Sequence, residues 1–273
     1  MRFASCALGE RRFAALVDGD VVRPLEGIEE LGAASRTEVL ADPPLTGEEL
    51  GLAEVRLRPV IPRPGKVVCL GLNYRAHVDE GVFDVPDYPV LFPKFADALI
   101  AAGDPIRVPP ESEAVDFEAE LAFVVGRRVR RARTETALEA VGGYTVANDV
   151  TMRDFQYKTH QWLQGKTWAD STPLGPFLVT PDEVGDPHDL DITLDLNGQR
   201  MQDANTSLML FDLPTIIATV SEFAPLAPGD VVLTGTPSGV GYRRDPKVLL
   251  ADGDRVVVEI ARVGRLENPV AAE

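Results

Sequence analysis

Short runs of β-prone apolar residues, separated by turns rich in glycine, proline and acidic residues, recur along most of the chain. These runs predict strands at residues 13–17, 21–22, 67–72, 117–125, 144–150, 176–180, 190–196, 230–234 and 255–260. Two segments between them, Asp18-Gly19-Asp20 and Asn197-Gly198, are typical of hairpin turns. The pattern predicts a mixed α/β fold that is rich in β structure.

Helices are predicted at three places. Pro214–Phe223 is expected to be helical, because a proline is well tolerated in the first turn of a helix. A short polar helix is predicted over Gly47–Leu52. Asn73 is expected to cap a third helix, which continues through His77 and Glu80.

A proline-rich segment divides the chain into two units of unequal size. Residues 1–58 are predicted to be a small β-containing domain, and residues 59–65 a stiff linker. Residues 66–273 are predicted to be the larger, catalytic domain. Within it, Gly81–Pro93 is interpreted as a loop because it is rich in proline and glycine.

Acidic and apolar residues alternate just before one of the apolar strands. In an extended strand the side chains of Glu118 and Glu120 point to the same face, where their charges repel each other. A divalent cation would remove that repulsion, and Asp149, in a later apolar segment, offers a third carboxylate. Three carboxylates suit Mg²⁺ or Mn²⁺. The alternative is the wet face of an edge strand, and Asp116 could be a fourth ligand or a neighbour that does not bind the ion.

Two short segments place potential acid–base and substrate-binding groups one helical turn apart. His77 and Glu80 would share a helix face, and a carboxylate beside an imidazole orients it and raises its basicity. Arg153 follows Asp149 by one turn and Gln156 follows Arg153, so the two could bind a substrate carboxylate and an oxygen. Surface ion pairs are the alternative in both cases.

Two glycine-punctuated segments could contact a small anion. Residues 164–176 are expected to be irregular, and Lys166 within them could stabilise a developing oxyanion. Residues 233–241 leave a strand into a loop where backbone amides such as that of Gly235, together with Thr236, could approach an anion. This loop lacks the G-K-[ST] ending of a phosphate-binding loop, which excludes nucleotide binding by that motif.

Composition narrows the classes of function. The 273 residues include 27 basic and 43 acidic side chains, and a net charge of −16 argues against binding to a nucleic-acid backbone. The basic cluster Arg127–Arg133 is interpreted as a solvated turn. No apolar run is long enough for a membrane span, and the isolated Cys6 and Cys69 fit a reducing, cytoplasmic location as buried thiols. Only three histidines are present (His77, His160 and His188). A three-histidine metal site would have to use all of them, which argues against such a site.

Five segments, taken in order, resemble the fumarylacetoacetate hydrolase family. They are G-L-N-Y-R-A-H-V-D-E, D-F-E-A-E-L-A-F-V-V-G, A-N-D-V-T-M-R-D-F-Q, G-K-T-W-A-D-S-T-P-L-G-P and L-T-G-T-P-S-G-V-G. The resemblance covers the chain from Lys66 onward. It implies a β-roll of mixed sheets and a homodimer. It also implies Mg²⁺ or Mn²⁺ on Glu118, Glu120 and Asp149.

The resemblance further implies roles for the remaining candidates. His77 and Glu80 correspond to the family's catalytic pair, on a segment that orders as a lid. Four residues match positions that contact substrate in the family (Arg153, Gln156, Lys166 and Thr236).

A metal chelated by a 2-oxo acid stabilises an enolate at C3, and this chemistry predicts the reaction class. We expect hydrolytic carbon–carbon cleavage of an acylpyruvate, with His77 activating water and Lys166 stabilising the oxyanion. Isomerisation of a 2-hydroxy-diene-dioate and decarboxylation of an oxaloacetate-type acid pass through the same enolate and stay open as alternatives. So does a non-catalytic metal-binding module, although such a module has no need of the His77–Glu80 pair.

Overall fold

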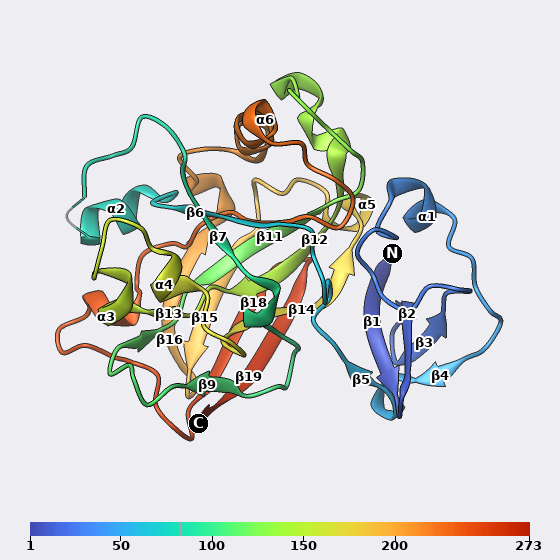
Figure 1. The fold of residues 1–273 in the computed structure, drawn as a ribbon, viewed down its shortest axis with the longest axis horizontal. Coiled ribbons are helices and arrows are strands. Elements are labelled where there is room, and N and C mark those ends of the chain that lie inside the picture. Colours follow the sequence, from blue (N-terminus) through green and yellow to red (C-terminus); the bar gives the residue numbers. More distant parts are fainter. Residues whose placement is uncertain (82) are drawn as a thin grey trace.

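The computed structural model describes residues 1–81 and 83–273 and consists mainly of strands (Figure 1). The strands are β1 (Arg2–Leu8), β2 (Arg11–Asp18), β3 (Val21–Pro24), β4 (Leu50–Gly51), β5 (Arg56–Leu57), β6 (Val67–Gly71), β7 (Val90–Lys94), β8 (Leu99–Ile100), β9 (Ile106–Val108), β10 (Val115–Asp116), β11 (Ala119–Val125), β12 (Val141–Asn148), β13 (Thr151–Met152), β14 (Thr172–Val179), β15 (Asp191–Leu196), β16 (Gln199–Asn205), β17 (Val231–Leu233), β18 (Arg255–Ile260) and β19 (Gly264–Ala272). The α-helices are α1 (Thr37–Ala41), α2 (Arg75–Gly81), α3 (Arg153–Gln156), α4 (Leu163–Lys166), α5 (Pro181–Val184) and α6 (Leu213–Phe223). Short 3-10 helices are η1 (Leu52–Glu54), η2 (Ala96–Ala98), η3 (Thr134–Ala140), η4 (Thr206–Leu208) and η5 (Gly241–Arg243). The predicted mixed, β-rich fold is confirmed.

One large mixed sheet runs through the whole molecule. Its strands follow the order β4-β3-β2-β1-β14-β12-β11-β17-β6-β7, with β5 paired to β1 and β8 paired to β14. Most pairs are antiparallel, and β17 runs parallel to β6. The N-terminal strands β1–β5 lie to one side of the molecule, on the right in Figure 1, and join the rest through the pairing of β1 with β14.

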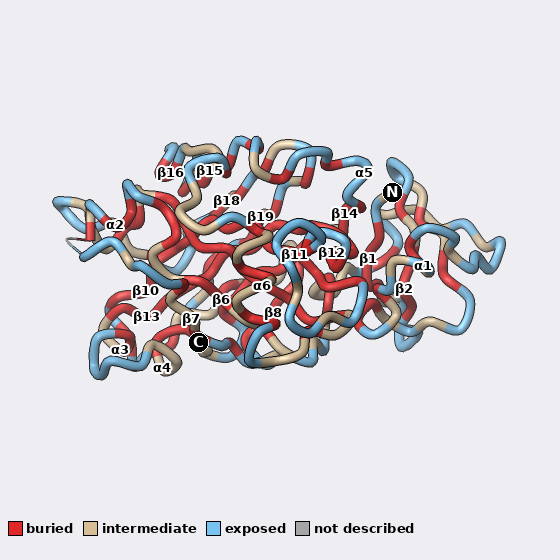
Figure 2. The backbone as a smooth tube through the Cα atoms, turned by 90° about the horizontal axis from the view of Figure 1, so that it is seen from above, coloured by how far each residue is buried: buried red, intermediate tan, exposed pale blue. Residues whose placement is uncertain are grey.

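A second sheet of five strands, in the order β16-β15-β18-β19-β9, packs against the large one. The core between them contains Leu121 and Phe123 of β11, Ile192 of β15 and Val258 of β18, all with at most 1% of their surface exposed. Figure 2 shows this continuous buried region along the central strands. Apolar burial on both sides makes β11 and β12 rigid supports for any side chains at their ends.

The strand predicted at 117–125 is broken in the structure, and this correction shapes the site. β10 pairs with β13 in a separate two-stranded sheet, and β11 begins only at Ala119. Side chains replace strand partners at the break. The amide of Phe117 donates to Asp116, and that of Glu118 donates to Oδ1 of Asn148 at 2.9 Å. Glu118 therefore lies in the gap between two strands and not in a strand.

Other predicted elements also differ from those observed. The helix predicted at Gly47–Leu52 is wrong, because Leu50 and Gly51 pair with β3 at the sheet edge and only the single turn η1 follows. The loop predicted at Gly81–Pro93 ends earlier, since β7 starts at Val90 and pairs with β6. Within that segment, Val82 lies outside the described residues.

Asn73 does not cap α2, which begins at Arg75. Its side-chain amide donates to the carbonyl oxygens of Thr234 and Phe211, at 2.7 and 3.1 Å, and its oxygen accepts from the Phe211 amide. These tertiary partners take the place of the local cap. The helix predicted from Pro214 and the Asn197-Gly198 turn are confirmed.

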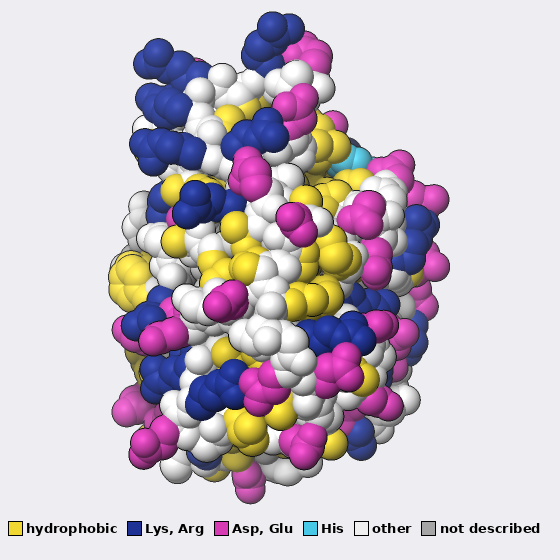
Figure 3. All heavy atoms as spheres, turned by 90° about the vertical axis from the view of Figure 1, so that its right-hand side faces the viewer, with side chains coloured by type: hydrophobic (Ala, Val, Ile, Leu, Met, Phe, Trp, Pro, Cys, Tyr) yellow, Lys and Arg dark blue, Asp and Glu magenta, His cyan; other side chains and the backbone are white. Residues whose placement is uncertain are grey.

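Charged side chains lie at the surface where the sequence predicts a solvated turn. All five arginines of the Arg127–Arg133 segment are exposed, as predicted for a solvated turn. In Figure 3 acidic and basic side chains are mixed over the visible face, and basic ones gather at its upper edge. Cys6 and Cys69 are buried free thiols. No helix in the described part of the chain is both long and apolar enough to cross a membrane.

Candidate active site

Three buried carboxylates meet where β11 begins and β12 ends. The antiparallel ladder places Glu120 opposite Ala147 and Ala119 opposite Asn148, so Glu118 and Asp149 flank the same end of the strand pair. The Asp149 amide donates to the Glu118 carbonyl oxygen at 2.9 Å. One oxygen of each carboxylate of Glu118, Glu120 and Asp149 lies within 4.8 Å of the others. The structure thus brings the three predicted ligands together.

Buried cations balance two of the three carboxylates. Nζ of Lys166 lies 2.6 Å from Oε2 of Glu118 and 2.7 Å from Oδ2 of Asp149. The second Asp149 oxygen accepts from Nζ of Lys94 at 2.5 Å, and Nη2 of Arg153 lies 2.6 Å from Oε1 of Glu118. Because all of these groups are buried, each charge depends on its partner to offset the cost of leaving water.

These contacts determine the protonation of the site. Burial by itself raises the pKa of Glu118, but the charges of Lys166, Arg153 and His77 lower it to about 2. Burial opposes the charged form of Lys166, yet Asp149 and Glu118 raise its pKa above the usual value. Glu118 is therefore an anion, and Lys166 a cation, over the physiological range.

Glu120 differs from its two neighbours. Its Oε2 accepts from the Gly235 amide at 2.8 Å, whereas its buried Oε1 has no hydrogen-bond partner among the described residues. Burial raises the pKa of Glu120 well above the usual value, and repulsion from Asp149 and Glu118 raises it further. An unpartnered buried oxygen beside two more carboxylates fits a hard divalent cation, which prefers oxygen ligands. The donor set thus fits Mg²⁺ or Mn²⁺.

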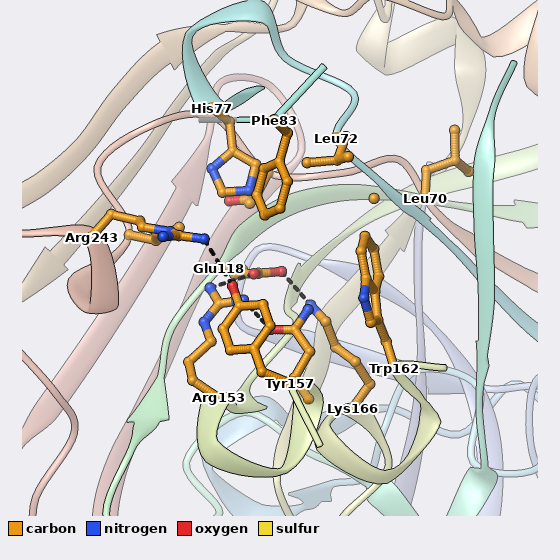
Figure 4. Close-up of a pocket in the computed structure, with 14 residues that line it drawn as sticks. Leu70, Leu72, His77, Phe83, Glu118, Arg153, Tyr157, Trp162, Lys166 and Arg243 are labelled. Atoms are coloured by element: carbon orange, nitrogen blue, oxygen red, sulfur yellow. Dashed lines mark hydrogen bonds and ion pairs between the residues drawn. The ribbon is translucent and has the colours of Figure 1, made fainter. Parts of the chain in front are cut away.

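His77 and Glu80 form the predicted pair on α2, at the opposite side of the same pocket. Nδ1 of His77 lies 2.9 Å from Oε1 of Glu80. The other Glu80 oxygen accepts from the Gly239 amide at 2.8 Å, which anchors the pair to the loop after β17. Figure 4 shows the imidazole of His77 above the carboxylate of Glu118. The imidazole is 9% exposed, so it can face a bound substrate while Glu80 holds its orientation.

Arg153 and Gln156 occupy α3, and Asp116 holds Arg153 in place. Nε of Arg153 donates to Oδ2 of Asp116 at 2.8 Å, and Nη1 donates to Oε1 of Gln156 at 2.9 Å. Asp116 also accepts from the amides of Gly241 and Tyr242, so all of its capacity is used within the protein. It is neither a fourth member of the carboxylate cluster nor solvated, and it acts by positioning Arg153.

Lys166 reaches the carboxylates because α4 packs closely on α3. A side chain at Gly165 would place its Cβ 2.5 Å from the backbone of Gln156, so only glycine allows this approach. Lys166 is the next residue and is 2% exposed. The segment predicted to be irregular at 164–176 therefore begins within one helical turn and ends in β14, so only its middle part is irregular.

The loop after β17 contributes Thr236 to the pocket. Gly235, whose amide was predicted to approach a substrate anion, has another role. The Gly235 amide is committed to Glu120, so it positions a carboxylate and is not available to a substrate anion. Gly235 has φ +95°, and a Cβ there would lie 2.7 Å from Asn73. Thr236 lines the pocket, and its hydroxyl accepts from Nε2 of Gln202 at 2.8 Å.

Sequence reasoning missed two buried residues of this site. Lys94 is 3% exposed and neutralises Asp149. A single lysine directly after the apolar residues 90–93 is a usable signal, but Lys94 lies just beyond the segment interpreted as a loop and received no prediction. Gln202 bonds the Ala119 amide, Thr236 and the Pro237 carbonyl, joining three segments. No local pattern marks a glutamine for that role.

The pocket above the carboxylates contains about 430 Å³ of empty space, part of which is open to solvent. Figure 4 shows aromatic rings of Phe83, Tyr157 and Trp162 around it, with Arg153 and Lys166 below and Arg243 to one side. His77, Glu118, Gln156 and Thr236 also line it. The mixed apolar and charged lining suits a small organic acid.

Comparison with known proteins agrees with this geometry. Residues 66–271 match the family described as fumarylacetoacetate (FAA) hydrolase C-terminal, and residues 1–59 match one described as Rv2993c-like, N-terminal. Oxaloacetate tautomerase fahd2, mitochondrial, of Xenopus laevis is 47% identical over 223 residues, covering 81% of this chain and 70% of that protein.

Solved structures resemble the whole chain. A 5-carboxymethyl-2-hydroxymuconate delta-isomerase from Mycobacterium smegmatis is 35% identical with a TM-score of 0.86, and covers 100% of both chains. A 2-hydroxyhepta-2,4-diene-1,7-dioate isomerase from Mycobacterium marinum is 34% identical with a TM-score of 0.85, covering 100% of this chain and 99% of that one. The family match covers residues 66–271, which include all five segments that resemble the family. This chain therefore belongs to the fumarylacetoacetate hydrolase family.

Proposed function

We propose that this enzyme is a divalent-metal-dependent tautomerase of short 2-oxo acids, which interconverts their keto and enol forms. The observation that carries the proposal is the anchored His77–Glu80 pair facing the Glu118, Glu120 and Asp149 carboxylates across one small pocket. Such a site offers a base on one side of a substrate and a place for a cation on the other.

Glu118, Glu120 and Asp149 would hold Mg²⁺ or Mn²⁺. When bound, the ion would polarise the carboxylate and keto oxygens of a 2-oxo acid and so make the proton at C3 more acidic. Lys166 and Arg153 lie within the same cluster, where they offset the charges of Glu118 and Asp149.

The chain's own residues supply the proton transfer. Because Nδ1 of His77 is bonded to Glu80, Nε2 remains for the substrate and can accept the proton that leaves C3. The Glu80 carboxylate stabilises the imidazolium while the negative charge moves to the 2-oxygen. Return of a proton to that oxygen completes the tautomerisation, with no net change in protons. Trp162 and Phe83 add apolar surface to the pocket.

This proposal differs from the primary expectation of hydrolytic cleavage of an acylpyruvate. Hydrolysis needs a water molecule positioned beside His77 in addition to the substrate, whereas tautomerisation needs only the base and the polarised ketone. The relatives named as a tautomerase and as isomerases support the alternative that the sequence left open. The homodimer and the cytoplasmic location both stay predictions.

The test follows the loss of the enol form of oxaloacetate by ultraviolet absorbance, with Mg²⁺ or Mn²⁺ and then with EDTA. We expect metal-dependent ketonisation by the wild-type enzyme and a loss of at least about 100-fold in His77→Gln, the size of a typical general-base contribution. His160→Gln is the matched control, since His160 is exposed.

Products distinguish the competing reactions. Acetylpyruvate and fumarylpyruvate are incubated in parallel, and pyruvate and carbon dioxide are quantified. Formation of pyruvate and an acid from either acylpyruvate would indicate hydrolysis. Formation of pyruvate and carbon dioxide from oxaloacetate would indicate decarboxylation. If either rate greatly exceeds that of tautomerisation, the proposed function is wrong. If no 2-oxo acid reacts in a metal-dependent way, a binding module is the better interpretation.

A further inference from the structure

One of the three cations that line the pocket differs from the other two. Arg153 is paired with Asp116 and Glu118, and Lys166 is paired with Glu118 and Asp149. Arg243 also lines the pocket, but no carboxylate within the described ranges, 1–81 and 83–273, lies at ion-pair distance from it. Its positive charge is therefore not neutralised by the protein around it.

Aromatic side chains hold Arg243 without cancelling its charge. Its guanidinium carbon lies 5.3 Å from the ring centre of Phe83, 5.8 Å from that of Tyr157 and 5.9 Å from that of Tyr242. Nη2 also donates to the Tyr157 hydroxyl at 3.2 Å. Contacts with ring faces attract a cation but leave the guanidinium donors largely free for a ligand.

The backbone that carries Arg243 is anchored to the same site. Arg243 ends η5, whose first residue, Gly241, donates its amide to Asp116 at 2.8 Å. A Cβ at Gly241 would lie against the carbonyl oxygen of Val248, so the turn can pack closely only with glycine. Figure 4 shows the guanidinium extending toward the pocket on the side away from Trp162. The position of Arg243 is therefore tied to that of Arg153 through Asp116.

We propose that Arg243 binds a second, distal carboxylate of the substrate, so that the enzyme prefers 2-oxo diacids to 2-oxo monoacids. The proposal rests on the proposed function, because the 2-oxo end of the substrate must lie toward the carboxylate cluster. A planar guanidinium donates two parallel hydrogen bonds to a carboxylate. Within a pocket partly closed to water, that recognition favours a charged group over a neutral one of similar shape.

The experiment compares two substrates that differ only at the distal group. Oxaloacetate carries a free second carboxylate, whereas its 4-methyl ester has the same chain with that charge removed. Tautomerisation of both is measured as exchange of the C3 hydrogens in deuterated buffer by proton NMR, with the uncatalysed rate subtracted. We expect the wild-type kcat/KM to favour oxaloacetate by about 10- to 100-fold, the range of one charge-assisted hydrogen bond.

Three variants locate this preference. Arg243→Met should lower the ratio of the two kcat/KM values by about 10- to 100-fold relative to the wild type, and Arg243→Lys, which keeps the charge but loses the fork, should lower it by less. Arg128→Met, at an exposed arginine, is the control and should keep the wild-type ratio. Inhibition by oxalate, which has no distal arm, and the melting temperature report whether the rest of the pocket is intact.

The outcomes separate this inference from the proposed function. If the wild-type enzyme exchanges neither compound, the proposed function itself fails. If it exchanges them and Arg243→Met keeps the wild-type ratio of the two kcat/KM values, the assignment of Arg243 is wrong while the tautomerase stands. A fall in the ratio that leaves oxalate inhibition and melting temperature unchanged supports the assignment.

Discussion

Glu80 connects the base of the site to a loop 159 residues further along the chain. One of its oxygens lies 2.9 Å from Nδ1 of His77, and the other accepts from the Gly239 amide at 2.8 Å. The carboxylate therefore fixes the position of the short helix α2 relative to the loop after β17.

Replacing Glu80 tests whether it orients His77. Glu80→Gln keeps an oxygen that can bond His77 but removes the charge that stabilises the imidazolium, so we expect kcat to fall about 10- to 100-fold with a smaller change in KM. Asp79→Asn is the control on the same helix, because Asp79 is exposed and its carboxylate pairs with Arg75. Equal kcat values for Glu80→Gln and the control would remove Glu80 from the mechanism.

The binding of Mg²⁺ should release protons. Since the pKa of Glu120 is raised by burial and by Asp149 and Glu118, this carboxyl holds a proton that a cation must displace. We therefore expect the affinity for Mg²⁺ to rise with pH. Calorimetric titrations in two buffers of different ionisation enthalpy measure the number of protons released.

Glu120→Gln should weaken Mg²⁺ binding by at least about tenfold and abolish its pH dependence, because the amide carries neither the charge nor the proton. Glu113→Gln, at an exposed position, should bind as the wild type does. Tight, pH-independent binding by Glu120→Gln would show that the ion is held elsewhere.

Gly165→Ala tests the close packing of α4 on α3. The new Cβ would lie 2.5 Å from the Gln156 backbone, so the two helices must separate and carry Lys166 away from Glu118. We expect a loss of about 1–3 kcal/mol in the free energy of unfolding, together with a lower kcat. Denaturant unfolding and steady-state kinetics check the two effects, and Gln161→Ala, at a nearby exposed position, is the control. Wild-type stability and rate in Gly165→Ala would contradict the packing argument.

Glu30 should make the free energy of unfolding depend on pH in the acidic range. Partial burial opposes its charged form, but hydrogen bonds from Arg63 and Arg58 lower the pKa of Glu30 below its usual value. A lowered folded-state pKa stabilises the protein above the unfolded-state pKa, and this stabilisation is lost as the pH falls through the folded-state value.

The comparison is made with Glu30→Gln. At neutral pH the variant should be less stable than the wild type, because it lacks the charge that pairs with the arginines. The loss should not exceed about 1 kcal/mol, since Arg63 is well exposed and solvent screens the pair. The difference should close as the pH falls through the lowered pKa of Glu30, where the wild-type carboxylate gains a proton and loses its charge. A difference that is constant from pH 7 to pH 3 would exclude the ion pair as its cause.

The sequence by itself determined the elements whose signals are local. The Asn197-Gly198 hairpin and the helix from Pro214 followed from residues that suit those conformations, and both are present. The identity of the three carboxylates followed from their residue type and spacing, together with the resemblance to the family. Their convergence within 4.8 Å agrees with that prediction.

Only the tertiary structure decided how these groups are arranged. Glu118 lies between two strands because the side chains of Asp116 and Asn148 take the backbone hydrogen bonds that a strand would make. The amide of Gly235 faces Glu120, and Lys94 faces Asp149, across sequence separations of 115 and 55 residues. Such pairings arise when buried charges must find partners as strands from distant segments meet. No pattern along the chain encodes them, because the energy of each depends on which other charges are buried beside it.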